Sequence, residues 1–326
     1  MISVIIATKD RSQKIELCLK SILKNTYKDF EIVLADQSCD GKTKQVVKKI
    51  KSPKITYLKL SSCGKTKAVN QAIGIARGKI LSFIDDDIIV DKFWLEHIKA
   101  FFDQNKNHQQ IAGVFGKILP YELNQHRNQI CPSIFTLNRK AFIANQYVTH
   151  YEELGLGSNM SLRKEVLSKI GYFREWLGPG YLGLGGGEDG ELIYRLLKNG
   201  YSLAYNPDIR AFHNRWLTYQ EYRIQQGRYT CGEITFCCYY FLKGDLHMGK
   251  IILDKMIERV FNSEFKDATK KILKIKKAFC LKDQKRFLKE LFFSGWEVIS
   301  IIKGFLVVFN LIFREKIINF GSLDRT

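Results

Sequence analysis

Four short apolar runs, each followed by a polar loop, constrain the fold of this chain more than any other feature. The runs span 2–7, 31–35, 55–60 and 79–84. Aliphatic and β-branched residues dominate them, as in strands that a sheet buries on both faces. Segments with helical periodicity occupy 12–24 and 65–77. This repeated order of strand, loop and helix predicts an α/β fold with a doubly wound, mostly parallel sheet.

Aspartates follow three of these runs, in the loops where the predicted strands end. Asp10 follows the first run, Asp36 the second, and the triplet Asp85-Asp86-Asp87 the fourth. Ligands of doubly wound sheets bind at the carboxyl ends of the strands. Adjacent carboxylates repel one another unless a cation lies among them, and a hard divalent ion shared with phosphate oxygens removes that repulsion. Taken by itself, the triplet would also be explained by an acidic turn on a solvated surface. The polar loops at the neighbouring strand ends favour a ligand site instead.

The middle of the chain carries weaker patterns. Strands are expected near 111–118 and 158–162, with a short helix at 163–170. The glycine-rich segment 178–187 has the flexibility of a lid or an acceptor-side loop. A helix is expected to start near Glu188, because apolar residues at helical spacing follow it.

Beyond about residue 236 the pattern becomes helical and basic. We therefore divide the chain into a first region, 1–235, and a basic helical region, 236–326. Residues 265–289 carry ten Lys or Arg against two Asp, and the apolar run 291–313 is long enough to span a bilayer. Charged residues interrupt that apolar run at two positions. Each would add ~2.5–3.5 kcal/mol to the free energy of membrane insertion if it lay near the centre of a spanning helix.

The basic run and the apolar run together favour an in-plane contact with an anionic membrane surface over a true span. The alternative is a terminal helix packed on the first region. The amino-terminal sequence MISVIIATKD has neither a basic n-region nor a cleavage site, and the eight cysteines show no CxxC or zinc spacing. These features predict a cytoplasmic protein, peripheral at the inner face of the plasma membrane.

The net charge of +19 raises two other functional classes besides a plain lysine-rich surface. A polyanion or nucleic-acid binder would need clustered basic and aromatic residues. No nucleic-acid motif is recognisable, so no such partner is expected. A nucleotidyltransferase would carry a glycine- and basic-rich loop after the first strand, whereas ATKDRSQK at 7–14 contains no glycine.

Five segments, in order along roughly residues 1–215, resemble glycosyltransferase family 2, whose fold is called GT-A. They are SVIIATKDR at 3–11, EIVLADQSCDG at 31–41, GKTKAVN at 64–70, SFIDDD at 82–87 and GEDGEL at 187–192. Two departures concern the contacts to uracil or ribose: Ala35 stands where many members have a first Asp, and Gln37 where many have Gly or Asn. The resemblance stops near residue 235.

The resemblance implies a metal-dependent, inverting glycosyltransferase that builds a surface polysaccharide or glycolipid. Its partners would be a nucleotide-sugar donor, expected to be a UDP-sugar, and a saccharide or lipid-linked acceptor. Asp85 and Asp87 would hold Mn²⁺ or Mg²⁺ across the donor diphosphate, as a Lewis acid on the leaving group. His213 would be a third metal ligand or a diphosphate contact, although a lone histidine is more often structural. The donor-binding residues would be Thr8, Asp10, Asp36, Lys65, Asn70, Asp85 and Asp86.

Asp189 is the candidate general base, because an inverting transfer needs one base to deprotonate the acceptor hydroxyl. Its place at the start of a predicted helix favours the ionised carboxylate. Glu188 is the second candidate for this role, and both residues could instead only cap the helix. Trp176 could stack on a sugar face or belong to the core.

Overall fold

A computed structural model describes residues 1–61, 63–126, 128–136, 142–144, 154–181, 184–260, 299 and 301–308. Its contacts divide the chain into two compact units. The first comprises Met1–Tyr181 and Glu188–Tyr222, and the second comprises Leu182–Gly187 and Arg223–Thr326. The two units are described separately below.

The strands of the first unit form one sheet in the order β3-β2-β1-β4-β8-β6-β9-β5, with β7 paired to β9. Their bounds are β1 Ile2–Thr8, β2 Phe30–Asp36, β3 Ile55–Lys59, β4 Ile80–Phe83, β5 Ile88–Val90, β6 Ile111–Pro120, β7 Phe142–Ala144, β8 Met160–Arg163 and β9 Ser202–His213. Strands β1, β2, β3, β4, β6 and β9 run in one direction, and β5, β7 and β8 run in the other. The predicted mostly parallel sheet is confirmed.

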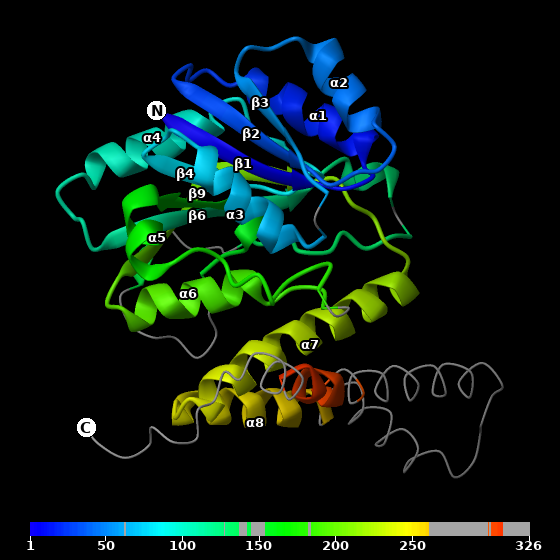
Figure 1. Cartoon of the computed structure of the whole chain (residues 1–326), viewed down its shortest axis with the longest axis vertical. Helices are drawn as coiled ribbons and strands as arrows, with labels where there is room; N and C mark the ends of the chain where they lie inside the picture. Colours follow the sequence, from blue (N-terminus) through cyan, green and yellow to red (C-terminus); the bar gives the residue numbers. More distant parts are fainter. Residues whose placement is uncertain are drawn as a thin grey trace. The chain divides into compact units, whose positions relative to one another are not determined.

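Helices cover both faces of this sheet (Figure 1). They are α1 Ser12–Leu23, α2 Lys42–Ile50, α3 Lys65–Ile75, α4 Trp94–Gln104, α5 Lys164–Ile170 and α6 Glu188–Lys198. Side chains of β1 alternate between the two faces: Val4 and Ile6 join the core cluster with residues of α1 and α4, whereas Ile5 and Ala7 face a cavity beside α3. Full burial of each large aliphatic side chain contributes ~1.5–3 kcal/mol, so this two-faced core holds the strand ends in place.

The register of the parallel strands brings the predicted site loops to one edge. Thr8, the last residue of β1, is paired with Asp36, the last residue of β2. Strand β4 pairs with β1 on the other side and ends at Phe83, two residues before the aspartate triplet. The carboxyl ends of these three strands therefore lie together, as the sequence predicts.

The second unit contains most of α7 Tyr219–Leu242, α8 Leu246–Val260 and a helical stretch at 301–308. That stretch packs closely on α7: a Cβ added at Gly304 would lie 3.0 Å from the carbonyl oxygen of Cys231. The predicted helical carboxy-terminal region is thus confirmed, while the boundary at residue 235 stays a prediction. The basic run 265–289 and residues 291–298, 300 and 309–313 of the apolar run lie outside the described residues.

No helix in the described part of the chain is long and apolar enough to cross a membrane.

Candidate active site

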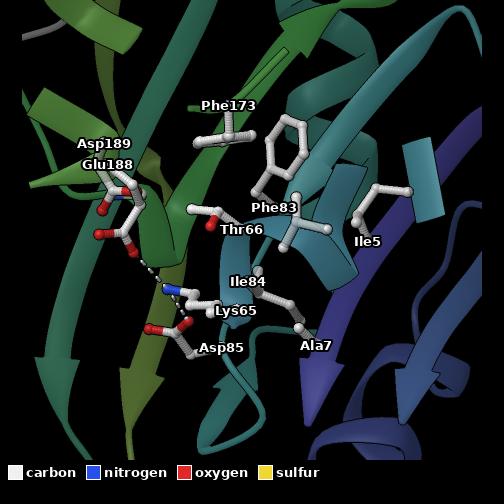
Figure 2. A pocket seen from close by; sticks show the side chains of 12 residues that line it. Ile5, Ala7, Lys65, Thr66, Phe83, Ile84, Asp85, Phe173, Glu188 and Asp189 are labelled. Atoms are coloured by element: carbon white, nitrogen blue, oxygen red, sulfur yellow. Dashed lines mark hydrogen bonds and ion pairs between the residues drawn. The ribbon is translucent and has the colours of Figure 1, made fainter. Parts of the chain in front are cut away.

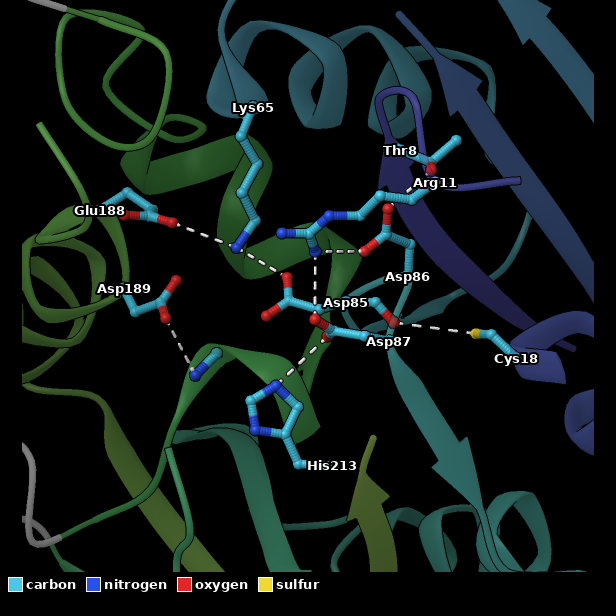
Figure 3. Close-up of polar contacts among 11 residues, drawn as sticks. Thr8, Arg11, Cys18, Lys65, Asp85, Asp86, Asp87, Glu188, Asp189 and His213 are labelled. Carbon is cyan, nitrogen blue, oxygen red and sulfur yellow. Dashed lines mark hydrogen bonds and ion pairs between the residues drawn. The ribbon is translucent and has the colours of Figure 1, made fainter. Parts of the chain in front are cut away.

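Two carboxylates of the aspartate triplet are buried against the loop that follows β1 (Figure 3). Nη1 of Arg11 lies 3.0 Å from Oδ1 of Asp86 and 3.1 Å from Oδ2 of Asp87. The hydroxyl of Thr8 donates a hydrogen bond of 2.7 Å to the other oxygen of Asp86. Buried carboxylates are costly unless they are paired and hydrogen-bonded, so Arg11 and Thr8 stabilise this arrangement. Burial and the negative charge of Asp87 raise the pKa of Asp86.

His213, the last residue of β9, faces the second of these carboxylates. Its Nε2 lies 3.3 Å from Oδ1 of Asp87, an ion pair that lacks the geometry of a hydrogen bond. Its Nδ1 donates to the carbonyl oxygen of Pro132. Burial alone would lower the pKa of His213, but the contact with Asp87 raises it to about 10. The same contact and Arg11 hold the pKa of Asp87 below its usual range, although burial alone would raise it.

A divalent cation fits the chemistry of these side chains, although no group of three or more His, Cys, Asp or Glu among the described residues has metal-binding geometry. Adjacent ligands on an octahedral ion with bonds of ~2.1 Å are about 3 Å apart. The Asp87–His213 separation of 3.3 Å is close to that value. The hydrogen bond from Nδ1 to a backbone carbonyl is also typical of histidines that bind metals. Arg11 now neutralises Asp87 and would have to move for a metal ligand to form.

An open cavity lies beside the first carboxylate of the triplet (Figure 2). One wall is apolar and includes the rings of Phe83 and Phe173, which meet edge to face at 5.4 Å. The other wall is charged. The residues that line the cavity are Ile5, Ala7, Lys65, Thr66, Val69, Phe83, Ile84, Asp85, Gly157, Phe173, Glu188 and Asp189.

Lys65, the first residue of α3, joins the two acidic sides of this cavity. Its Nζ lies 2.8 Å from Oδ1 of Asp85 and 3.2 Å from Oε1 of Glu188. Burial alone would lower the pKa of Lys65, but Asp85 and Glu188 raise it well above its usual value. The other carboxylate oxygen of Glu188 is buried and has no hydrogen-bond partner within the described chain. The cavity therefore presents the positive charge of Lys65 and one acceptor oxygen of Glu188 to a ligand.

Asp189 lies in the first turn of α6 and lines the same cavity. Its Oδ2 accepts a hydrogen bond of 3.1 Å from the backbone N–H of Gly157. Desolvation by the surrounding protein and the negative charge of Glu188 raise the pKa of Asp189 to about 7, against the opposing effects of Lys65 and Gly157. A carboxylate that titrates near neutral pH is suited to accept a proton from a hydroxyl.

The remaining predicted donor-binding residues do not line this cavity. Asp36 is fully buried, and its two oxygens accept hydrogen bonds from Tyr57 at 2.6 Å and from the N–H of Ser38 at 2.8 Å. Oδ1 of Asp10 accepts a hydrogen bond of 3.2 Å from the N–H of Cys39, so it ties two strand-end loops together. Their roles in binding a nucleotide stay predictions.

The side chain of Asn70 also makes its hydrogen bonds within the protein. Its side chain donates to the carbonyl oxygen of Phe173 at 2.9 Å and accepts from the N–H of the same residue at 3.1 Å. Asn70 therefore holds the aromatic wall of the cavity and is not one of its lining residues. Trp176 is partly buried and does not line the cavity either.

Sequence patterns single out neither Arg11 nor Gly157, although both contact the predicted acidic residues. Arg11 had a usable signal, because a basic residue just after the first strand lies at the same sheet edge as the triplet. Gly157 had none, since its partner Asp189 is 32 residues away along the chain.

Comparison with known proteins agrees with this geometry. A doubly wound sheet with acidic loops at the carboxyl ends of its strands and a charged cavity beside one of them is typical of α/β proteins that bind their ligand at this edge. Residues 3–171 match the family model described as Glycosyl transferase family 2. The chain belongs to glycosyl transferase family 2, as the sequence motifs predict.

This chain matches only part of the length of two curated relatives. UDP-Glc:alpha-D-GlcNAc-diphosphoundecaprenol beta-1,3-glucosyltransferase WfaP of Escherichia coli is 32% identical over 136 residues, which cover 38% of this chain and 53% of WfaP. Poly(ribitol-phosphate) beta-N-acetylglucosaminyltransferase TarS of Staphylococcus aureus is 27% identical over 146 residues, which cover 42% of this chain and 25% of TarS.

Solved structures share the fold over most of the chain. The mannosyltransferase PcManGT from Pyrobaculum calidifontis, in complex with GDP-Man and Mn²⁺, has a TM-score of 0.59 at 16% identity and covers 93% of this chain and 86% of its own. Residues 1–349 of S. aureus TarS have a TM-score of 0.53 at 18% identity. This match covers 97% of this chain and 91% of the TarS chain. The predicted GT-A-type fold is confirmed.

Proposed function

We propose that this chain is an inverting glycosyltransferase that moves a sugar from a nucleotide-diphosphate donor, expected to be a UDP-sugar, to a saccharide or lipid-linked acceptor. The observation that carries the proposal is one cavity lined by Asp85, Glu188 and Asp189, in which Lys65 pairs with Asp85 and Glu188. The names of the relatives support the substrate classes. WfaP is named for transfer from UDP-Glc to a diphosphoundecaprenol-linked sugar, and TarS for transfer to poly(ribitol-phosphate). We therefore place the reaction in the synthesis of a cell-surface polysaccharide or glycolipid.

The chemistry follows from the charges around the cavity. Asp189 accepts the proton of the acceptor hydroxyl while that oxygen attacks the anomeric carbon, and the bond from that carbon to the diphosphate breaks. Lys65 offsets negative charge on the departing group. Asp85, Asp87 and His213 would hold Mn²⁺ or Mg²⁺, which supplies Lewis acidity to the diphosphate when bound. Attack on the side opposite the leaving group inverts the anomeric configuration.

The test is a thermal-unfolding screen of nucleotide sugars with Mn²⁺, with Mg²⁺ and with EDTA. A ligand that binds only the folded protein stabilises it by about 2.7 kcal/mol at 100 times its Kd. We expect one UDP-sugar to raise the Tm more with metal than with EDTA, and to be hydrolysed slowly. A Tm that no nucleotide sugar raises under any of these conditions would exclude a donor site.

The pH dependence of transfer should report the base. Asp189 must be ionised to accept a proton, and its pKa is raised to about 7, so kcat/KM should rise as the pH increases through about 7. The shift has the opposite sign for stability, because the folded state binds this proton more tightly than the unfolded chain does. Its contribution to folding is fully present below the usual pKa of 3.8 and is lost as the pH rises through about 7. The measurement is kcat/KM between about pH 5 and 9, with Tm followed in parallel. An activity that is level through this range would contradict the assignment.

We also propose that the second unit attaches the protein to an anionic membrane surface. In the described residues 299 and 301–308, the helical stretch packs on α7 at Gly304, and the side chains of Ile299, Ile302 and Leu306 are 57%, 53% and 62% exposed. Exposed apolar residues next to a basic segment are typical of helices that lie in the membrane interface. Packing on α7 and contact with lipid thus involve different faces of one helix.

Replacing Ile302 and Leu306 by Ser should reduce co-sedimentation with anionic vesicles, because burial of two large aliphatic side chains in the interface is lost, at ~1.5–3 kcal/mol each. The control is Leu123→Ser, at a residue 57% exposed in the first unit. High salt should weaken the binding of all variants by screening the basic residues. A wild-type protein that stays in the supernatant with anionic vesicles would show that no membrane attachment exists.

A further inference from the structure

We infer that the turn η3, Gly157–Asn159, is a positioning element for the general base, with the backbone N–H of Gly157 fixing the carboxylate of Asp189 against the cavity. The inference rests on the proposed role of Asp189 and adds a residue that the family motifs in this sequence do not contain. Figure 2 shows the Asp189 carboxylate at the charged end of the cavity.

The first observation is the closeness of the contact. A Cβ added at Gly157 would lie 2.2 Å from Oδ2 and 2.3 Å from Oδ1 of Asp189, so any side chain there would overlap the carboxylate. The φ of Gly157 is not positive, and its backbone conformation is therefore open to other residues. A side chain at this position would therefore displace the Asp189 carboxylate.

The second observation is the rigidity of the turn. Asn159 is 1% exposed, and its Oδ1 accepts a hydrogen bond of 2.9 Å from the indole N–H of Trp94. Its amide group donates to the carbonyl oxygens of Lys117 and Ile209, both at 3.0 Å. These bonds tie the turn to α4, β6 and β9, so the N–H of Gly157 points in a fixed direction. Precise placement of a base depends on such fixed support.

The third observation is the electrostatic setting of the base. Burial, followed by Glu188 on the same helix and Asp85 after β4, opposes ionisation of Asp189. Lys65 on α3 and the N–H of Gly157 on η3 favour it. A hydrogen bond to the ionised form lowers the pKa of a carboxyl group. The Gly157 contact therefore affects both the position of the carboxylate and the pH at which it can act.

The test is Gly157→Ala, compared with Gly74→Ala as a matched control. A Cβ added at Gly74 on α3 meets no atom within 4 Å. Turnover is followed with UDP-glucose and UDP-N-acetylglucosamine, and binding is followed with UDP. Displacement of a catalytic group by ~1 Å costs on the order of 10²-fold, so we expect Gly157→Ala to lower kcat by about that factor with unchanged affinity for UDP. The rising limb of its kcat/KM profile should move to higher pH, and Gly74→Ala should match the wild type.

The double variant Gly157→Ala with Asp189→Asn isolates the contact. If Gly157 acts through Asp189, the first substitution lowers the residual turnover of Asp189→Asn no further. A Gly157→Ala enzyme with wild-type kcat and pH profile would overturn the inference. So would a Gly157→Ala enzyme that loses both UDP affinity and kcat while the rising part of its kcat/KM profile stays at the wild-type pH. An Asp189→Asn enzyme with near-normal turnover would instead overturn the proposed base itself.

A second variant covers the case in which Gly157→Ala fails to fold. Asp189→Glu retains the carboxylate but lengthens the side chain by one methylene, so the same contact is disturbed from the other partner. We expect retained UDP affinity, a lower kcat and a shifted pH limb. Wild-type turnover and pH profile in this variant would show that the position held by Gly157 is unimportant.

Discussion

Asp189→Asn should remove sugar transfer while leaving donor binding within a few-fold of the wild type. An amide has nearly the shape of the carboxylate and can still accept the hydrogen bond from Gly157, but it cannot take a proton from the acceptor. Loss of a general base lowers kcat by roughly 10²–10⁴-fold. The measurement is kcat for transfer together with the Kd for donor, because a group that acts on the acceptor changes the first and spares the second.

The matched control is Asp103→Asn, which makes the same chemical change on an exposed residue of α4 whose carboxylate pairs with Lys99 one turn away. Glu188→Gln separates the two candidate bases. Its carboxylate pairs with Lys65, so its loss should affect the charge balance of the cavity more than the proton transfer. Near-normal turnover of Asp189→Asn, with a large loss in Glu188→Gln, would transfer the role of base to Glu188.

Much of the fold could be predicted because the signals are local. The runs at 2–7, 31–35, 55–60 and 79–84 became β1, β2, β3 and β4 within a residue or two, since buried parallel strands are almost continuously apolar. The reversed strands β5 and β7 have three residues each, too few for an alternating or apolar pattern to stand out.

The candidate site was predictable in its acidic residues and not in their partners. A strand followed by three aspartates indicates an anionic edge, and the parallel order of the strands brings Lys65 and Asp85 to it. The bridge from Arg11 to the triplet spans about 75 residues and depends on the exact approach of two loops. The bond between Asn70 and Phe173 spans 103 residues, so no local pattern shows that Asn70 supports the cavity wall.

Asp87→Asn should remove the metal-dependent part of donor binding. Asp87 is buried between Arg11 and His213, and its Oδ1 accepts no hydrogen bond from the described residues. An amide oxygen at that place is a weaker ligand for a hard divalent cation than a carboxylate oxygen. Changes in the residues that merely support metal ligands cost about 10–100-fold in affinity, so loss of a ligand itself should cost at least ~100-fold.

The variant also removes the negative partner of two cations, and that effect must be separated from metal binding. Breaking a buried ion pair on one side costs ~3–5 kcal/mol, so Asp87→Asn should unfold at a lower Tm than the wild type but still cooperatively. Asn is the better substitution than Ala here because it keeps the volume of the side chain and one acceptor oxygen near Arg11.

Donor affinity is therefore measured twice for each protein, with Mn²⁺ and with EDTA, at a temperature below both unfolding transitions. We expect the wild type to bind donor more tightly with Mn²⁺, and the variant to bind equally under the two conditions at the affinity of the wild type in EDTA. A variant that keeps the full Mn²⁺ effect would show that Asp87 is no ligand and that its function is to pair with Arg11 and His213. A wild type without any Mn²⁺ effect would show that Arg11, Lys65 and protonated His213 balance the charge of the site without a metal.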